Sequence, residues 1–146
     1  MECSKKAVEI FNEGFNCSQA VFAAFSEKVG LSEEQCLKLS SAFGGGFGRQ
    51  REVCGAVSGM LMAFGLLYGY SDIEDASVKA ELYEKTRELC NQFKDINGSI
   101  ICREILKDAE VGGTPEKRTE QYYKERPCER CVRTAAEILE KYIENN

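Results

Sequence analysis

The sequence predicts an all-α protein, a single-domain helical bundle of about six to seven helices over residues 1–146, with a glycine-rich loop before a buried central helix. Apolar residues recur at helical spacing, and no run alternates with the period of two that a half-buried strand requires. Polar caps and glycines stand where helices would begin and end. A chain of 146 residues has the length of one domain.

Before the glycine-rich run we expect helices that begin at polar caps: residues 4–13 with Ser4 as cap and Gly14 after the end, residues 17–29 with Asn16 and Gly30, and residues 33–43 opened by the capping box Ser32-Glu-Glu-Gln35. After it we expect helices from Val53 or Cys54 to about Tyr70, from Ile73 to Lys94, from Ile100 to about Lys107 behind a Ser99 cap, around Tyr122 and Tyr123, and from Pro127 to Tyr142. Residues 108–118 form the clearest loop.

The glycine-rich run carries the first candidate ligand-binding residues: Gly44, Gly45, Gly46, Gly48, Arg49 and Arg51. Glycines in this density serve positive φ angles or a close approach of the backbone to another group. We interpret the two arginines first as solvent-exposed side chains. In the alternative they offset thiolate charge or, with the glycine amides, hold an anion. The run is not a phosphate-binding P-loop, because the Gly-Lys-Ser/Thr sequence is absent.

Composition excludes several functional classes. A net charge of −5 argues against nucleic-acid binding. The most apolar stretch, residues 53–70, is interrupted by glycines and short for a bilayer span, so we expect no membrane insertion. We see no secretory signal and expect a cytoplasmic protein. With no histidine in the chain, Cys-His and Ser-His nucleophile pairs and histidine-ligated zinc are excluded.

The eight cysteines are the strongest functional signal. In a reducing compartment, cysteine richness indicates metal binding or redox chemistry rather than a disulfide framework. Four of them fall in the first turn of a predicted helix: Cys17, Cys54, Cys102 and Cys128. A thiolate is favoured at a helix N-terminus, so converging helix starts would form a metal–sulfur or redox-thiol site. In the alternative interpretation, the four cysteines are separate core residues without a shared site. We assign Cys3 to a mobile terminus.

The four cysteines lie in recognisable runs: Phe-Asn-Cys17-Ser-Gln-Ala-Val, Phe-Gly-Gly-Gly-Phe-Gly before Cys54-Gly-Ala-Val-Ser-Gly59, Cys102-Arg-Glu-Ile-Leu, and Cys128 ahead of Val-Arg-Thr-Ala-Ala-Glu-Ile-Leu139. These runs resemble the C_GCAxxG_C_C family of redox-active proteins over residues 7–139. The resemblance implies that these are the family's four cysteines. A related domain occurs in split-Soret cytochromes, where an iron–sulfur cluster is associated with such cysteines; this chain lacks the haem-attachment part.

The first functional hypothesis is therefore an electron-transfer or redox-sensing protein in which Cys17, Cys54, Cys102 and Cys128 ligate an iron–sulfur cluster, [2Fe–2S] rather than [4Fe–4S], with zinc or no metal as alternatives. Cys131 forms Cys-x-x-Cys with Cys128, so either could be the fourth ligand, or the two could form a disulfide.

Two other hypotheses stay open. One is a thiol–disulfide oxidoreductase that uses Cys54 with Cys17, Cys102 or Cys128, and the other is a helical interaction module with structural buried cysteines. Whether the protein is an enzyme is therefore open. The sequence does not identify the redox partner. Two glycine pairs, Gly55/Gly59 and Gly65/Gly69, would permit close helix contacts within the chain or in a homodimer.

Overall fold

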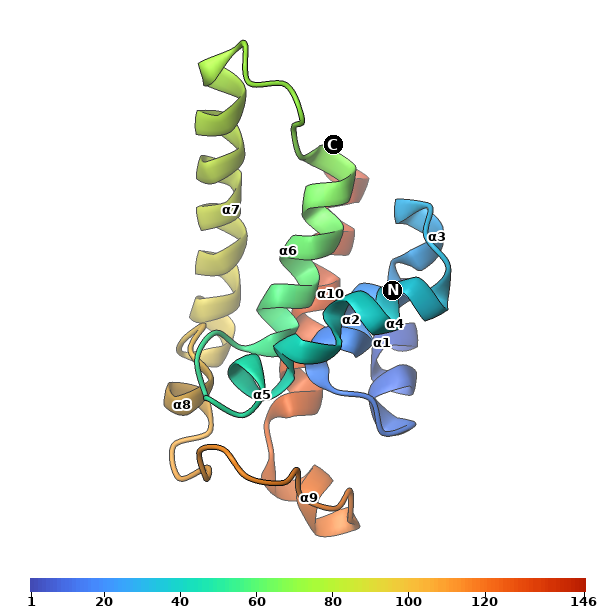
Figure 1. The fold of residues 1–146 in the computed structure, drawn as a ribbon, viewed down its shortest axis with the longest axis vertical. Helices are drawn as coiled ribbons and strands as arrows, with labels where there is room; N and C mark the ends of the chain where they lie inside the picture. The colour runs from blue at the N-terminus through green and yellow to red at the C-terminus, as the bar shows by residue number, and fades with distance from the viewer.

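A computed structural model describes residues 1–124 and 126–146 and confirms the all-α prediction. The elements, labelled in Figure 1, are α1 (Glu2–Asn12), α2 (Cys17–Ala24), α3 (Ser26–Val29), α4 (Glu33–Ser40), the 3₁₀ turn η1 (Ser41–Phe43), α5 (Gly44–Phe47), α6 (Gly55–Tyr68), α7 (Ala76–Asn97), α8 (Cys102–Ile105), α9 (Glu120–Glu125) and α10 (Cys128–Asn145). Apart from an isolated β-bridge between Val53 and Ile101, the described residues contain no strand.

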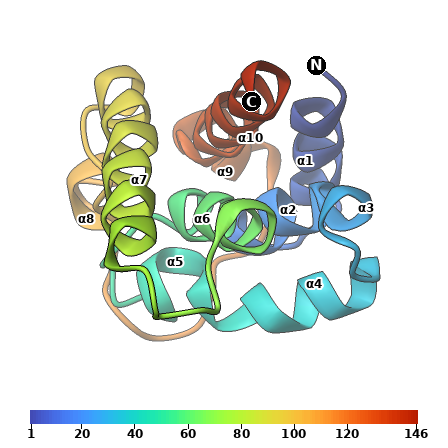
Figure 2. The ribbon, with the colours of Figure 1, turned by 90° about the horizontal axis from the view of Figure 1, so that it is seen from above.

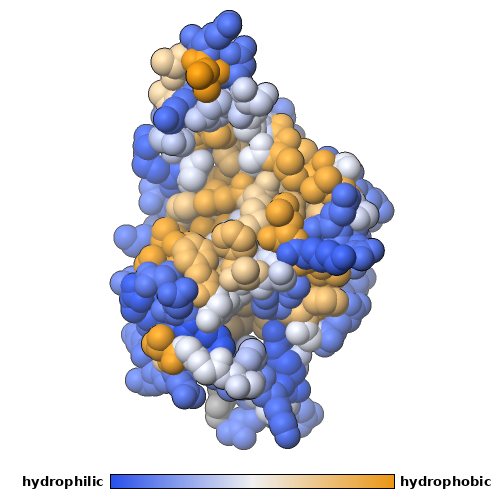
Figure 3. All heavy atoms as spheres, in the orientation of Figure 1, coloured by the Kyte–Doolittle hydropathy of each residue, from blue (hydrophilic) through white to orange (hydrophobic). Residues whose placement is uncertain are grey.

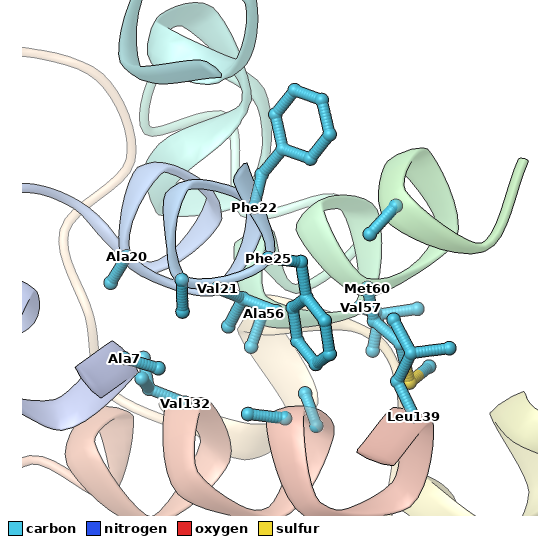
Figure 4. Packing of buried hydrophobic residues seen from close by; sticks show 14 of the residues in the cluster. Ala7, Ala20, Val21, Phe22, Phe25, Ala56, Val57, Met60, Val132 and Leu139 are labelled. Atoms are coloured by element: carbon cyan, nitrogen blue, oxygen red, sulfur yellow. The ribbon is translucent and has the colours of Figure 1, made fainter. Parts of the chain in front are cut away.

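Helices α2 and α6 lie side by side in the middle of the molecule, surrounded by α1, α10, α7 and α4 (Figure 2). The hydrophobic core fills the space between α1, α2, α6 and α10, where Phe25, Val57, Met60 and Leu139 are buried (Figure 4). Phe22 is also buried, but its ring points away from α10. The N-terminal ends of α6 and α10 lie at the same end of the bundle, beside α5 and α8 (Figure 1). This arrangement brings several helix starts together.

Helix α6 is the predicted central helix, and glycine lets it approach α2 closely. A Cβ at Gly59 would lie 2.6 Å from the carbonyl oxygen of Ser18, and one at Gly55 would lie 3.1 Å from the Ser18 nitrogen. The second glycine pair makes no such contact, since a Cβ at Gly65 would meet nothing within 4 Å. Helix α6 is buried on one side only, and on its other side Leu66 is 52 % exposed. Apolar residues accordingly gather along the middle of the face shown in Figure 3, over α6.

Helix ends that depend on neighbouring residues agree with the sequence prediction. The capping boxes at Asn16 and Ser32 are both formed, and Gly30 and Gly98 end helices in the left-handed conformation with φ of 77° and 88°. The helix expected over residues 17–29 is broken at Phe25, whose ψ of 10° separates α2 from α3. Breaks of this kind give more helical segments than expected.

The predicted start of the first helix is wrong, and the reason is tertiary. Ser4 is not the cap, because α1 already begins at Glu2. The carboxylate of Glu140 on α10 accepts hydrogen bonds from the backbone N–H groups of Cys3 (3.0 Å) and Ser4 (3.1 Å). Cys3 is consequently buried, with 6 % of its surface exposed, instead of lying on a mobile terminus.

Two later helices begin later than predicted, and α7 also ends three residues later, at Asn97. Helix α7 begins at Ala76, where Asp75 accepts a hydrogen bond from the N–H of Ser77, so residues 73–75 precede it. Helix α8 begins only at Cys102, whose own N–H is donated to the carbonyl of Glu52. None of the helices in the described part of the chain combines the length and apolar character needed to cross a bilayer.

Candidate functional site

The glycine-rich segment forms a left-handed turn that leads to the site. Its positive φ angles are 67° at Gly45, 68° at Gly46, 66° at Phe47, 64° at Gly48, 70° at Arg49 and 62° at Arg51. The N–H of Gly48 donates to the carbonyl of Gly44 across the turn, at 2.9 Å. A Cβ at Gly46 would lie 2.5 Å from the backbone nitrogen of Glu52, so this position requires glycine. The turn brings the arginines that follow it to the interior.

A short backbone pairing sets two cysteines next to each other. The N–H of Cys54 donates to the carbonyl of Ile100 (2.8 Å), and the N–H of Cys102 donates to the carbonyl of Glu52 (2.6 Å). Cys54 is the N-cap residue of α6, and Cys102 is the first residue of α8. Two cysteines that are 48 positions apart in sequence therefore lie on paired segments, with Val53 and Ile101 bridged between them.

The sulfur atoms interact in pairs. Cys17, at the start of α2, interacts with Cys128 at the start of α10, and Cys54 interacts with Cys131. The thiol of Cys131 donates its hydrogen bond to Oδ1 of Asn97, at 3.7 Å. The charges of these pairs also influence each other, and Cys102 responds to Cys54 and Cys128. All eight cysteines, which lie within the described residues, are free thiols.

Each pair contains one thiol that ionises more readily than its partner. Interaction with the Cys17 thiol lowers the pKa of Cys128 despite burial, helped by the charges of Arg126, Arg118 and Arg51. Interaction with the Cys131 thiol likewise lowers the pKa of Cys54, with help from the N–H groups at the start of α6. The same interactions, together with burial, raise the pKa of Cys17 and of Cys131.

Cys102 lies in a different environment. Burial raises the pKa of its thiol, and Arg51 opposes this effect with Nη1 at 3.8 Å from the sulfur. Cys102 is thus held by an arginine rather than by another thiol. Cys131, which the sequence offered as an alternate to Cys128, lies in the cluster together with Cys128 and interacts with Cys54.

A cleft of about 270 Å³ opens beside this cysteine cluster. Its lining includes Cys17 and Cys128, three glycines of the loop, and four arginines: Gly44, Gly45, Gly48, Arg49, Arg51, Arg118 and Arg126. The prediction that Arg49 and Arg51 are solvent-exposed is wrong, because only 7 % and 2 % of their surfaces are exposed. Carbonyl groups of Gly112 and Glu110 accept hydrogen bonds from their Nε atoms, at 2.7 and 3.0 Å. The loop over residues 108–118 therefore buries them.

Glu116 joins the arginines of the cleft. Its carboxylate accepts hydrogen bonds from Arg49 (2.5 Å) and Arg126 (2.8 Å), and it lies 4.0 Å from Nη2 of Arg51. Burial by itself would raise the pKa of Glu116, but hydrogen bonds from its own backbone N–H and from Arg49 and Arg126 lower it to about 2. Glu116 is therefore ionised at neutral pH, and it neutralises only part of the positive charge.

Sequence reasoning missed Glu116, Arg118 and Arg126. Arg118 donates to the carbonyls of Phe11 (3.2 Å) and Phe15 (2.9 Å), and its guanidinium lies over the ring of Phe11 at 4.4 Å from the centroid. All these contacts span more than 100 residues. The only local signal was that Glu116 and Arg118 lie in the loop at residues 108–118 and that Arg126 lies just before the start of the last helix.

The cysteine cluster does not have the geometry of a single metal-ion site. Within the residues that the structure describes, no group of three or more cysteine, aspartate or glutamate side chains is arranged to hold a metal ion. The thiols approach one another in pairs instead, as described above.

The chain is similar to known proteins over most of its length. Residues 15–142 match the model of a family described as "Putative redox-active protein (C_GCAxxG_C_C)". An uncharacterised protein of Archaeoglobus fulgidus is 23 % identical over 124 residues, which cover 80 % of this chain and 82 % of that protein. No solved structure matches. Because the family match spans the cysteine cluster and nearly all of the bundle, the chain belongs to the C_GCAxxG_C_C family of redox-active proteins.

Proposed function

We propose that this protein transfers electrons or senses redox state through an iron–sulfur cluster held by the cysteine cluster. One observation carries the proposal: five cysteines from four separate segments converge in the interior, although hydrophobic packing would not require sulfur at any of them. A bound cluster would supply one-electron chemistry. The chain itself supplies thiolates, burial and the positive charge of the arginines, which together influence the reduction potential.

The paired thiols suggest which residues would act as ligands. In a four-cysteine two-iron cluster each iron takes two cysteines, whereas zinc takes four sulfurs in one tetrahedron. Pairing of Cys17 with Cys128 and of Cys54 with Cys131 therefore fits two irons better than one zinc ion. Cys17, Cys54 and Cys128 are the ligands common to this arrangement and to the four cysteines of the family. Either Cys102 or Cys131 would be the fourth ligand of the cluster.

Anaerobic reconstitution with iron and sulfide tests this proposal. We expect visible absorption and bound iron in the native chain, and their loss in Cys17→Ser, Cys54→Ser and Cys128→Ser. Comparison of Cys102→Ser with Cys131→Ser identifies the fourth ligand, because only the ligand's variant loses iron. Cys90→Ser is the control, since Cys90 lies on α7, and burial alone raises the pKa of its thiol. A colourless, iron-free native chain would contradict the proposal.

A second candidate function, thiol–disulfide exchange, is favoured by the cleft. Cys17 and Cys128 both line it, whereas Cys54 does not, so exchange would begin at Cys128. The Cys128 thiolate would attack a partner disulfide and release one thiolate, and Cys17 would then displace the second to close an intramolecular disulfide. In metal-free protein treated with oxidised glutathione, a Cys17–Cys128 disulfide in the native chain and a mixed disulfide trapped at Cys128 in Cys17→Ser would support this function. Absence of both species would exclude it.

A further inference from the structure

Arg51 carries a buried donor without an acceptor. Its surface is 2 % exposed, and its Nε and Nη1 atoms are occupied by the carbonyl of Glu110 and the sulfur of Cys102. Its Nη2 atom is the buried side-chain nitrogen or oxygen that has no hydrogen-bond partner among the described residues. The carboxylate of Glu116, at 4.0 Å, is too distant for a hydrogen bond. Leaving a charged donor buried and unpaired is costly, so its position points to an absent acceptor.

The cleft that Arg51 lines has an excess of positive charge. Its lining contains the four arginines and one carboxylate, Glu116, which is already engaged by Arg49 and Arg126. Arg118 is held by backbone carbonyls, which do not neutralise it. A buried cluster of like charges repels itself, and an anion in the cleft would relieve this repulsion.

The size and donor chemistry of the cleft restrict the anion. A volume of about 270 Å³ accommodates an inorganic oxyanion or a small organic acid. A guanidinium fork pairs well with the oxygen atoms of carboxylate, phosphate or sulfate. On the loop side, a Cβ at Gly45 would lie 3.1 Å from Cγ of Arg49, so glycine leaves room for this arginine side chain.

We propose that this cleft binds a small oxyanion, with Nη2 of Arg51 as the central donor. The anion would lie beside Cys17 and Cys128, the two thiols that line the cleft. Its role as a substrate or effector of the redox site rests on the proposed function, but its binding does not. The class of ligand is therefore a small acid, inorganic or organic.

Calorimetric titration of the full chain, reduced and metal-free, at constant ionic strength in chloride tests this binding. Sulfate, phosphate and lactate are titrated separately, so that an inorganic anion is distinguished from a carboxylate. We expect saturable binding of at least one of them at a single site. Arg51→Gln should weaken it by about tenfold or more, because a charged hydrogen bond and one positive charge are lost.

Two further variants keep the test informative. Arg126 lies at the more exposed side of the cleft, where 19 % of its side chain is accessible. Arg126→Gln should therefore also weaken anion binding, and it provides a test even if Arg51→Gln fails to fold. Arg103→Gln is the matched control, because Arg103 pairs with Glu52 on the surface, at 2.8 Å, and does not line the cleft. Its affinity should equal that of the native chain.

Absence of saturable binding of all three anions would overturn the proposal, as would equal affinities in Arg51→Gln, Arg126→Gln and the native chain. If the metal-free chain binds no anion while Arg51→Gln alters only the visible spectrum of the reconstituted protein, the acceptor for Arg51 is the cluster, and the oxyanion site is wrong. Failure of iron binding leaves this titration unaffected, so the two proposals fail separately.

Discussion

At the scale of single residues, Glu116 reduces the repulsion among the four arginines that line the cleft. It is the carboxylate that contacts Arg49, Arg126 and, at longer range, Arg51. Two of these arginines also adopt left-handed backbone angles, which cost non-glycine residues about 1–2 kcal/mol each. Strain of this kind persists where surrounding contacts enforce it, and it is concentrated here beside the cysteine cluster.

Replacement of Glu116 by Gln should change the pH dependence of stability. The folded pKa of about 2 lies below the ordinary value of 4.5, so ionised Glu116 stabilises the fold above pH 4.5. That stabilisation is lost as the pH falls through about 2. We expect Glu116→Gln to be less stable than the native chain near neutral pH, and its stability to fall less on acidification.

Urea unfolding at a series of pH values measures this difference. Glu110→Gln is the control, because the Glu110 side chain is 79 % exposed and lies 3.9 Å from Arg49, so it should leave the profile almost unchanged. Identical pH profiles for Glu116→Gln and the native chain would show that Glu116 does not hold the arginines as described.

At the scale of elements, the packing of α6 on α2 depends on one face of α6. Gly55 and Gly59 lie against the backbone of α2 near Ser18, whereas Gly65, six residues after Gly59, faces open space. The same residue type in the same helix therefore has two different roles. This contact also sets the start of α6, with Cys54, against the start of α2, with Cys17.

Alanine at the two glycine positions should have opposite effects. Gly59→Ala places a Cβ at 2.6 Å from the Ser18 carbonyl, and we expect a loss of at least about 2 kcal/mol of unfolding free energy. Gly65→Ala meets no neighbour and should stabilise the helix by about 0.5–1 kcal/mol. Chemical denaturation of the two variants provides the comparison. A Gly59→Ala protein as stable as the native chain would contradict the close approach.

At the scale of the whole molecule, the two ends of the chain stabilise each other. Helices α1 and α10 pack side by side, and Glu140 caps the start of α1 with two hydrogen bonds. Because α10 also carries Cys128 and Cys131, this contact helps to hold one wall of the cysteine cluster. Closing the bundle thus connects its stability to the cysteine cluster.

Removal of this cap should lower stability. We expect Glu140→Ala to cost about 1–2 kcal/mol of unfolding free energy, because the N–H groups of Cys3 and Ser4 lose their acceptor. Glu144→Ala, an exposed position on the same helix, should change stability by less than about 0.5 kcal/mol. Thermal or urea unfolding followed by circular dichroism distinguishes them, and equal stabilities would rule out the cap.

The sequence by itself determined the helical class, most helix ends and the placement of cysteines at helix starts. It could do so because the capping boxes at Asn16 and Ser32 and the glycine end at Gly30 involve residues only a few positions apart. The first turns of helices are therefore visible in local sequence, and so are the thiols that stand in them.

Only the tertiary structure decided which side chains complete the site. Arg49 is buried because Glu116 pairs with it across 67 positions, and Cys3 is buried because Glu140 caps α1 across 137 positions. Likewise, Cys131 interacts with Cys54, a residue 77 positions away, as well as lying near Cys128. Periodicity and spacing report which face of a helix is apolar, but they do not say which distant charge or thiol will meet it. That choice is made by how the helices pack.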